Sequence, residues 1–274
     1  MCCGAARSAS RNRVLIRQTA IGVNFIDIYF RQGLYPWQVA SDLILGSEGA
    51  GVVDTAGPDA SGFDVGQRVD YAIANGAYAT HRLVPAAQIV ALPDDISDEV
   101  AAAVMLKGLT AYYPIRDSYD AKPGDTVLFH AAAGGVRLIA GQWLQARGVR
   151  AIGTAVGVEK CALARAHGYG DVIDYQREDF VSRVKELTDG AGVAGVFDSV
   201  GRDTIMGSVA CLARFGTFVS FGQSSGMPDM FRISDLATGS LRLTRPILFH
   251  YTASLARLET ATAALFDVIR TGEV

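Results

Sequence analysis

The chain has 274 residues, of which 50% are hydrophobic and 19% are charged, and its formal net charge is −3. This length and composition are typical of a globular protein with one large domain or two modest ones, and they exclude a disordered chain. The small negative charge, without a long run of lysine or arginine, argues against a nucleic-acid-binding protein, and the longest apolar runs, such as 100–106, are too short to span a bilayer.

The cysteines indicate a cytoplasmic protein without a metal site. Cys2, Cys3, Cys161 and Cys211 form no C-x-x-C pair and no cluster with histidine at metal-ligand spacing. Few cysteines without a signal peptide are typical of a reducing compartment. Residues 1–13 carry arginines but no acid, and we interpret them as an atypical tail.

The first hundred residues are predicted to be mainly β. They are rich in glycine, in valine runs and in turn signals such as Pro58-Asp59 and Asn75-Gly76. Small residues fill the segment 48–71, where Gly66 marks a turn before the next strand. We expect a β domain over residues 14–105.

From Thr126 onward, short β-branched runs alternate with helix-like stretches. This alternation predicts βαβ units and a doubly wound parallel sheet, an α/β fold of the Rossmann type. The expected strands are 126–132, 149–155, 171–175, 193–200, 217–222 and 241–246, and the expected helices are 136–148, 161–168, 180–188 and 203–213. Residues 253–274 have the apolar periodicity of a further helix.

The stretch HAAAGGVRLIAGQW, residues 130–143, joins the first of these strands to its helix. Backbone N–H groups at such a helix N-terminus bind phosphate, so the stretch indicates a nucleotide site. In the register Ala132-x-Gly134-x-x-Arg137, an arginine stands where dinucleotide loops usually have glycine. We expect Arg137 to swing outward for steric reasons, so that Arg137→Gly would raise both cofactor affinity and thermal stability.

The end of the second strand distinguishes NADP from NAD. It runs into Gly153 and Thr154 and then reaches Lys160, with no acid before Glu159. A cation there suits a 2′-phosphate, whereas an acid would bond the ribose hydroxyls, so NADP is favoured. Lys160 is equally compatible with a solvated cation in the first turn of a helix.

Six separated blocks carry a resemblance to a known family. They are NFIDIYFRQGLYP (24–36), LKGLTAYY (106–113), FHAAAGGV (129–136), IDYQRED (173–179), DSVGRDT (198–204) and SFGQSSG (220–226). In this order they closely resemble the NADPH-dependent quinone oxidoreductases, the zinc-free branch of the medium-chain dehydrogenase/reductase superfamily. The likeness extends from about Ala20 to Thr271.

The resemblance implies a fold and an activity. It implies a GroES-like, mainly β catalytic domain over 14–105, a Rossmann NADPH-binding domain over 106–248, and a helix over 249–274 that returns toward the catalytic domain. Where zinc-containing relatives have a G-H-E block, this chain has Gly46-Ser47-Glu48, so the hydride would pass from NADPH to a small quinone without a metal. A homodimer through the strand near Leu241 to Arg245 is also implied.

The resemblance further assigns site residues. Asn24, Tyr29 and Thr110 would be catalytic; Lys107, Ala133, Gly134, Gly135, Val136, Thr154, Lys160, Tyr175, Phe221, Gly222 and Ser224 would bind the cofactor. The alternatives are surface polarity for Asn24 and Tyr29, and helix capping for Thr110, which we place with Lys107 at a helix start. His130 and Asp198, at strand ends, are interpreted as hydrogen-bonded structural residues.

Two departures from the family keep other functions open. Both ends of the β domain lack expected elements, and Arg137 alters the phosphate loop. One alternative is an enone or alkenal reductase, since that reaction also delivers hydride to a conjugated acceptor. Another is a catalytically impaired paralogue that binds NADPH without turnover.

Overall fold

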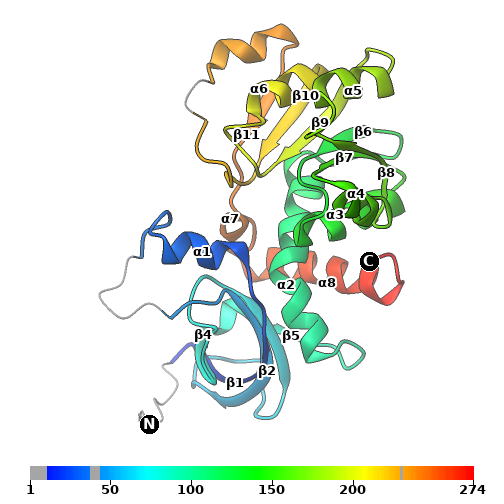
Figure 1. Cartoon of the computed structure of the whole chain (residues 1–274). Helices are drawn as coiled ribbons and strands as arrows, with labels where there is room; N and C mark the ends of the chain where they lie inside the picture. Colours follow the sequence, from blue (N-terminus) through cyan, green and yellow to red (C-terminus); the bar gives the residue numbers. More distant parts are fainter. Residues whose placement is uncertain (1–10, 38–43, 229–230) are drawn as a thin grey trace. The chain divides into compact units, whose positions relative to one another are not determined.

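The structure is a computed structural model that describes residues 11–37, 44–228 and 231–274. The chain forms two compact units (Figure 1). The first unit comprises Met1–Leu109 and Tyr251–Asp267, and the second comprises Thr110–His250 and Val268–Val274. Most of the predicted tail lies outside the described residues, and β1 already begins at Arg13.

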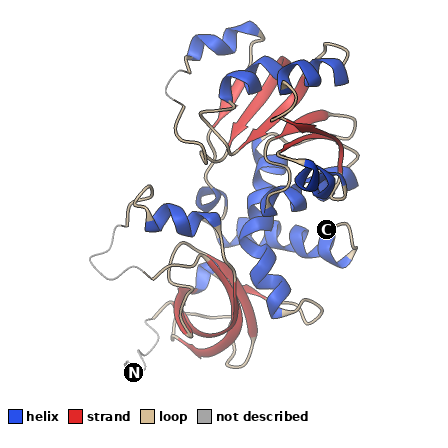
Figure 2. Ribbon diagram, viewed as in Figure 1, coloured by secondary structure: helices blue, strands red, loops and turns tan. Residues whose placement is uncertain are grey.

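The first unit contains a five-stranded antiparallel sheet in the order β4-β1-β2-β3-β5, drawn in red in the lower part of Figure 2. Its strands are β1 (Arg13–Ile21), β2 (Glu48–Ala56), β3 (Arg68–Ala72), β4 (His81–Pro85) and β5 (Val90–Ala91). Alternate residues of these strands, including Val14, Ile16, Val69 and Tyr71, are buried in one core. The predicted β character of this region is confirmed.

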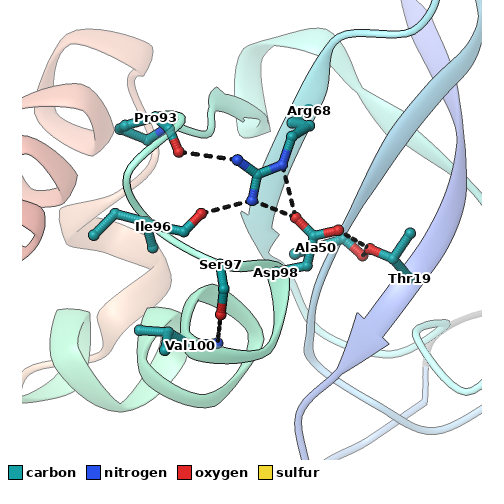
Figure 3. Close-up of polar contacts among 8 residues, drawn as sticks. All are labelled: Thr19, Ala50, Arg68, Pro93, Ile96, Ser97, Asp98 and Val100. Carbon is teal, nitrogen blue, oxygen red and sulfur yellow. Dashed lines mark hydrogen bonds and ion pairs between the residues drawn. The ribbon is translucent and has the colours of Figure 1, made fainter.

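Two helices of this unit carry residues of interest, α1 (Phe25–Arg31) and α2 (Asp98–Tyr113). The start of α2 is tied to the sheet (Figure 3): Arg68 Nη2 on β3 lies 2.6 Å from Asp98 Oδ1, and Thr19 Oγ1 on β1 donates to Asp98 Oδ2 at 2.5 Å. Ser97 Oγ accepts a 3.2 Å bond from Val100 N–H in the first turn. Three separate segments therefore meet at one carboxylate.

The second unit contains a six-stranded parallel sheet in the order β11-β10-β9-β6-β7-β8, drawn in red in the upper part of Figure 2. Its strands are β6 (Thr126–Phe129), β7 (Arg150–Ala155), β8 (Tyr169–Asp174), β9 (Val193–Asp198), β10 (Leu212–Ser220) and β11 (Arg242–Thr244). The helices are α3 (Gly135–Ala146), α4 (Val158–Arg165), α5 (Phe180–Leu187), α6 (Ile205–Cys211), α7 (Leu248–Tyr251) and α8 (Leu255–Arg270), the last of which belongs mostly to the first unit.

This sheet is the predicted Rossmann arrangement, with apolar residues buried on both faces. Leu128 and Val196 face a core to which Val184 of α5 and Ile205 of α6 contribute. On the opposite face Phe129 stacks on its neighbour Phe197, with ring centroids 5.1 Å apart. Because helices must cover both faces of a parallel sheet, alternating strand residues pack against different helices.

Several element boundaries differ from expectation. Helix α4 spans Val158–Arg165 and not 161–168, and β11 ends at Thr244 and not at residue 246. The helix predicted over 203–213 ends at Cys211, because β10 begins at Leu212 and not at residue 217. The predicted strand ends at 132, 175, 200 and 222 lie beyond the observed ends at 129, 174, 198 and 220. The residues in between form the loops at the carboxyl edge of the sheet.

Within the part of the chain that the structure describes, no helix has both the length and the apolar character that crossing a membrane requires.

Candidate active site

The strand order of the second unit reverses between β6 and β9, which are neighbours in the sheet although β6 is the first strand of the set. In open α/β sheets ligands bind beyond the carboxyl ends of the strands at such a switch point. A ligand site is therefore expected at the loops that follow β6, β9 and β10.

The loop after β6 exposes the start of α3. Ala131 has a positive φ of 56° and Ala132 N–H donates to Thr154 O at 2.8 Å, which turns the chain sharply away from the strand. Gly134 is the N-cap of α3, in an extended conformation. Helix geometry leaves the first-turn amides, such as those of Gly135 and Val136, without intrahelical acceptors, so they can bind an anion.

A buried hydrogen-bonded chain lies beneath this loop. His130 Nδ1 lies 3.1 Å from Thr154 Oγ1, and His130 Nε2 lies 2.9 Å from Ser208 Oγ. Ser208 and Thr204 hydroxyls donate to Asp198 Oδ2 at 3.3 and 2.6 Å. Burial lowers the pKa of His130, against the opposing charge of Asp198. The structural roles expected for His130 and Asp198 agree with these contacts, and Thr154 is fully buried where it orders the loop.

The loops after β9 and β10 are held against each other. Ser224 N–H donates to Ser199 O at 3.0 Å. A Cβ on Gly222 would lie 2.6 Å from Ser199 Cβ, so glycine is required at this crossing. Phe221 packs edge-on against Phe129, with ring centroids 5.8 Å apart. The predicted residues 221, 222 and 224 are thus brought next to the loop after β6.

The expectation that Arg137 swings outward is wrong. Its guanidinium donates to Ser199 Oγ and lies 5.8 Å from the centroid of the Phe221 ring. A Cβ on Gly134 would lie 2.8 Å from Arg137 Nη1, so the side chain folds back over the loop. The inward orientation is favoured because the guanidinium contacts a hydroxyl acceptor, Ser199, and an aromatic face, Phe221, on that side.

The close helix-to-sheet contact falls at Gly141 and not at position 137. A Cβ on Gly141 would lie 2.4 Å from His167 O and 2.4 Å from Tyr169 Cε2. Tyr169 lies on β8, and its hydroxyl donates to Arg137 O at 2.8 Å. One turn of helix therefore separates Arg137 from the position where only glycine fits, which removes the steric objection to an arginine.

Lys160 and Tyr175 follow β7 and β8 at the same edge of the sheet. Lys160 lies in the first turn of α4, is exposed, and forms no ion pair with any described residue. Tyr175 directly follows β8 and is 46% exposed. Both side chains are accessible to a ligand that extends along the carboxyl edge from the loop after β6.

In the first unit, two of the predicted site residues contact one buried carboxylate, that of Glu48. Asn24 Nδ2 donates to Glu48 Oε1 at 2.6 Å, and Lys107 Nζ lies 3.0 Å from the same oxygen. Leu106 N–H donates to Glu48 Oε2 at 2.6 Å. Burial raises the pKa of Glu48, although the charge of Lys107 and these hydrogen bonds oppose the shift. Asn24 and Lys107 are therefore held in fixed positions by Glu48.

A second buried carboxylate lies at the start of α1. Asp27 Oδ2 accepts from Asn24 N–H at 3.0 Å and from Tyr78 OH at 2.8 Å, and Ser47 Oγ donates to Asp27 Oδ1 at 2.9 Å. Burial, together with Asp27, raises the pKa of Tyr78 to about 12. Among residues 11–37, 44–228 and 231–274, no three histidine, cysteine or acidic side chains gather as they would around a metal ion.

Tyr29 and Thr110 lie on different helices of the chain. Tyr29 lies on α1 and packs against Phe25 of the same helix and against Tyr35, which follows the helix, with ring centroids 5.2 and 5.3 Å away. Thr110 lies near the end of α2, three residues after Lys107. The prediction that Lys107 and Thr110 stand at a helix start is wrong, because α2 begins at Asp98, and a capping role for Thr110 is excluded.

Sequence reasoning missed Glu48 and Ser199 as organising residues. In the sequence Glu48 stood out only as part of Gly46-Ser47-Glu48, which replaces the G-H-E block of zinc-containing relatives. Its partner Lys107 is 59 positions away in the chain. Ser199 is separated from Arg137 by 62 positions. Contacts at such separations leave no local pattern in a single sequence.

Two domain families match the chain. Residues 10–94 match the alcohol dehydrogenase GroES-like domain, and residues 135–263 match the family described as zinc-binding dehydrogenase. The chain is 47% identical over 265 residues to a quinone oxidoreductase of Pseudomonas aeruginosa, which covers 95% of this chain and 81% of that protein. It is 40% identical over 272 residues to a 2-haloacrylate reductase of a Burkholderia species, covering 97% and 82%.

Solved structures give the same result. The quinone oxidoreductase of Escherichia coli complexed with NADPH superposes with a TM-score of 0.95 at 44% identity, covering 99% of this chain and 83% of that one. The 2-haloacrylate reductase structure gives a TM-score of 0.91 at 39% identity, covering 99% and 83%. The switch-point loop, the two kinds of sheet and these likenesses agree, and the chain belongs to the quinone oxidoreductases of the medium-chain dehydrogenase/reductase superfamily.

Proposed function

We propose that this protein is an NADPH:quinone reductase that transfers hydride without a catalytic metal. The observation that carries the proposal is the loop after β6, which presents the first-turn amides of α3 at the switch point of the sheet. The names of the relatives and the NADPH complex of the Escherichia coli protein support the substrate and the cofactor.

The residues at the carboxyl edge suit a dinucleotide once the Arg137 guanidinium moves aside. The amides of Gly135 and Val136 would bind the pyrophosphate, next to Ala133 and Gly134. Exposed Lys160 would pair with the 2′-phosphate, and Tyr175 would lie beside the adenosine. Phe221, Gly222 and Ser224 would line the nicotinamide ribose, while buried Thr154 supports the loop.

Bound NADPH would supply the hydride, and the chain's own residues would position the quinone. We propose that Asn24, Tyr29, Lys107 and Thr110 line the substrate pocket. Glu48 fixes Asn24 and Lys107, so two hydrogen-bond donors are preorganised for quinone oxygens. One hydride and one proton convert a quinone to the hydroquinone, and this proton would come from solvent.

The metal-free assignment rests on donor chemistry. Where a zinc enzyme of this superfamily would need a histidine ligand, Ser47 donates a hydrogen bond to Asp27. Asn24 is likewise engaged with Glu48. Neutral hydroxyl and amide groups are poor zinc ligands compared with thiolate and imidazole.

The direct test is oxidation of NADPH by the purified protein in the presence of a small benzoquinone or naphthoquinone. We expect quinone-dependent turnover that is faster with NADPH than with NADH. A folded protein that binds NADPH tightly but gives no turnover with any quinone would contradict the proposal, and it would favour the catalytically impaired paralogue.

A second candidate acceptor is an activated alkene. The observation that favours it is the 40% identity to a 2-haloacrylate reductase, nearly as high as that to the quinone oxidoreductases. Both reactions deliver hydride to a conjugated acceptor. Comparing kcat/KM for a naphthoquinone, an enone and a 2-haloacrylate on one preparation separates the two activities.

We also propose that the protein is a cytoplasmic homodimer formed through β11. This strand is the edge of the parallel sheet, and its Leu243 is 39% exposed. An edge strand with an exposed apolar side chain can pair with the same strand of a second copy about a two-fold axis.

A further inference from the structure

We infer that Arg137 is a latch across the phosphate loop, which is closed by its bond to Ser199 and must release Ser199 before NADPH can bind. This inference rests on the proposed function, since it assigns a role to one side chain in the same cofactor site. It concerns a residue in which this chain departs from the glycine usual at that position of a dinucleotide loop.

The latch crosses the switch point. Arg137 lies in the first turn of α3, which follows β6, and Ser199 directly follows β9. Since β6 and β9 are adjacent strands, the bond between Arg137 and Ser199 Oγ joins the two loops between which a dinucleotide is expected to lie. A pyrophosphate on the first-turn amides of α3 would meet this side chain.

The partners of the guanidinium are fixed in place. Ser199 is only 5% exposed, and its carbonyl accepts from Ser224 N–H at 3.0 Å. Phe221, whose ring centroid is 5.8 Å from the guanidinium carbon, is itself backed by Phe129. A charged donor with a rigid acceptor and an aromatic face loses little entropy on closing, so the closed position is favoured.

In the closed position the guanidinium lies against Gly134, where the loop would approach a bound phosphate. A single methyl group on Gly134 would already come within 2.8 Å of Arg137 Nη1. Glycine at this point normally leaves room for close approach of a pyrophosphate to the backbone. The guanidinium and the pyrophosphate therefore exclude each other unless the side chain rotates away from Ser199.

The consequence is a lower apparent affinity for the whole cofactor but not for its adenosine end. If the latch is open in about one molecule in ten, the apparent Kd for NADPH is about tenfold higher than that of an unlatched loop. Lys160 and Tyr175 follow β7 and β8, on the other side of β6 from Ser199. Adenosine 2′-monophosphate, which keeps the 2′-phosphate but lacks both phosphates of the pyrophosphate and the nicotinamide, should therefore bind without opening the latch.

The test is isothermal titration calorimetry of the full chain with NADPH and with adenosine 2′-monophosphate. We expect Arg137→Gly to tighten NADPH binding about tenfold and to leave binding of the monophosphate unchanged. Ser199→Ala, which removes the acceptor but keeps the arginine, should tighten NADPH binding by a smaller factor. Arg183→Gly is the matched control, because it makes the same change in α5, where Arg183 pairs with Glu178 and Glu186.

Each other outcome overturns the latch. Weaker NADPH binding in Arg137→Gly would show that Arg137 is a phosphate ligand. Equal changes in affinity for both nucleotides, or no change in either affinity, would show that Arg137 has only a structural role. Unchanged NADPH affinity in Ser199→Ala overturns the latch independently, should Arg137→Gly fail to fold. Binding of the monophosphate without binding of NADPH by any variant would overturn the latch alone, whereas failure of both nucleotides would overturn the proposed function with it.

Discussion

Arg137 stabilises the second unit through contacts that its sequence position did not reveal. It lies in a helix and donates to Ser199, so Arg137→Gly removes a hydrogen bond and adds a flexible residue to α3. We expect the free energy of unfolding to fall by about 1–2 kcal/mol, the reverse of the rise expected from the sequence. Urea unfolding of the ligand-free variant measures it, and a stability equal to or above that of the parent would contradict these contacts.

Lys160 is predicted to select NADPH over NADH. It is exposed in the first turn of α4, where a 2′-phosphate could pair with its ammonium. Lys160→Ala should weaken NADPH binding on the order of tenfold and leave NADH nearly unchanged, because only NADPH carries that phosphate. Calorimetric titration with both cofactors measures the difference.

The matched control for Lys160 is Lys122→Ala. Lys122 is 65% exposed and precedes β6, at the opposite edge of the sheet from Lys160. Equal losses for both cofactors in Lys160→Ala, or an equal loss in Lys122→Ala, would show that only the general charge of the surface matters.

At the residue scale, the sequence predicts which residues form the site better than it predicts where their side chains point. Local sequence pattern is enough to predict the phosphate loop at Gly134 and Gly135 and the structural role of His130. The inward path of Arg137 depends on Ser199, which is 62 positions away, and no local pattern could reveal it. The role of Glu48, which holds Asn24 and Lys107 in place, was not predicted for the same reason.

At the scale of single elements, the packing of α3 on the sheet depends on Gly141. Its Cβ position lies 2.4 Å from a backbone carbonyl, that of His167, which cannot move as a flexible side chain can. We expect Gly141→Ala to lower the free energy of unfolding by about 2 kcal/mol, even after the gain in helix propensity. Chemical denaturation measures the change.

Gly170→Ala serves as the control for this substitution. Gly170 lies on β8, is exposed, and has no atom within 4 Å of its Cβ position. Its replacement should change stability by only a few tenths of a kcal/mol. If Gly141→Ala were as well tolerated as Gly170→Ala, helix α3 would not be packed as closely as described.

The elements themselves were largely predictable, and their ends were not. Six alternating β-branched runs give the six parallel strands, because period and length are local properties. The start of α2 at Asp98 was missed, since it is set by Arg68 and Thr19, which lie elsewhere in the chain. The early start of β10 at Leu212 is likewise set by pairing with Val193 on β9.

At the scale of the whole molecule, the proposed homodimer depends on the edge strand β11. Leu243→Lys places a charge in that edge, and charges on edge strands oppose strand pairing between copies. We expect the variant to sediment as a monomer while the parent sediments as a dimer. Val65→Lys, at a residue 73% exposed in the first unit, should leave the dimer intact. A parent that is monomeric at all concentrations tested would contradict the proposal.

The meeting of Arg68, Thr19 and Asp98 has a consequence for acid resistance. Burial would raise the pKa of Asp98, but hydrogen bonds from Thr19 and Arg68 and the charge of Arg68 outweigh it and lower the pKa below 3.8. A lowered carboxyl pKa gives stability that is complete above the unfolded-state value and is lost as the pH falls through the folded-state value.

Helix α2 begins at Asp98, so protonation of this carboxyl group weakens the contacts with Arg68 and Thr19 that hold the start of the helix. Asp98→Asn should be less stable than the parent at neutral pH, with the difference shrinking as the pH falls below 3.8. Urea unfolding across an acid series measures it, and a difference that stays constant in acid would show that the carboxylate charge does not hold the three segments together.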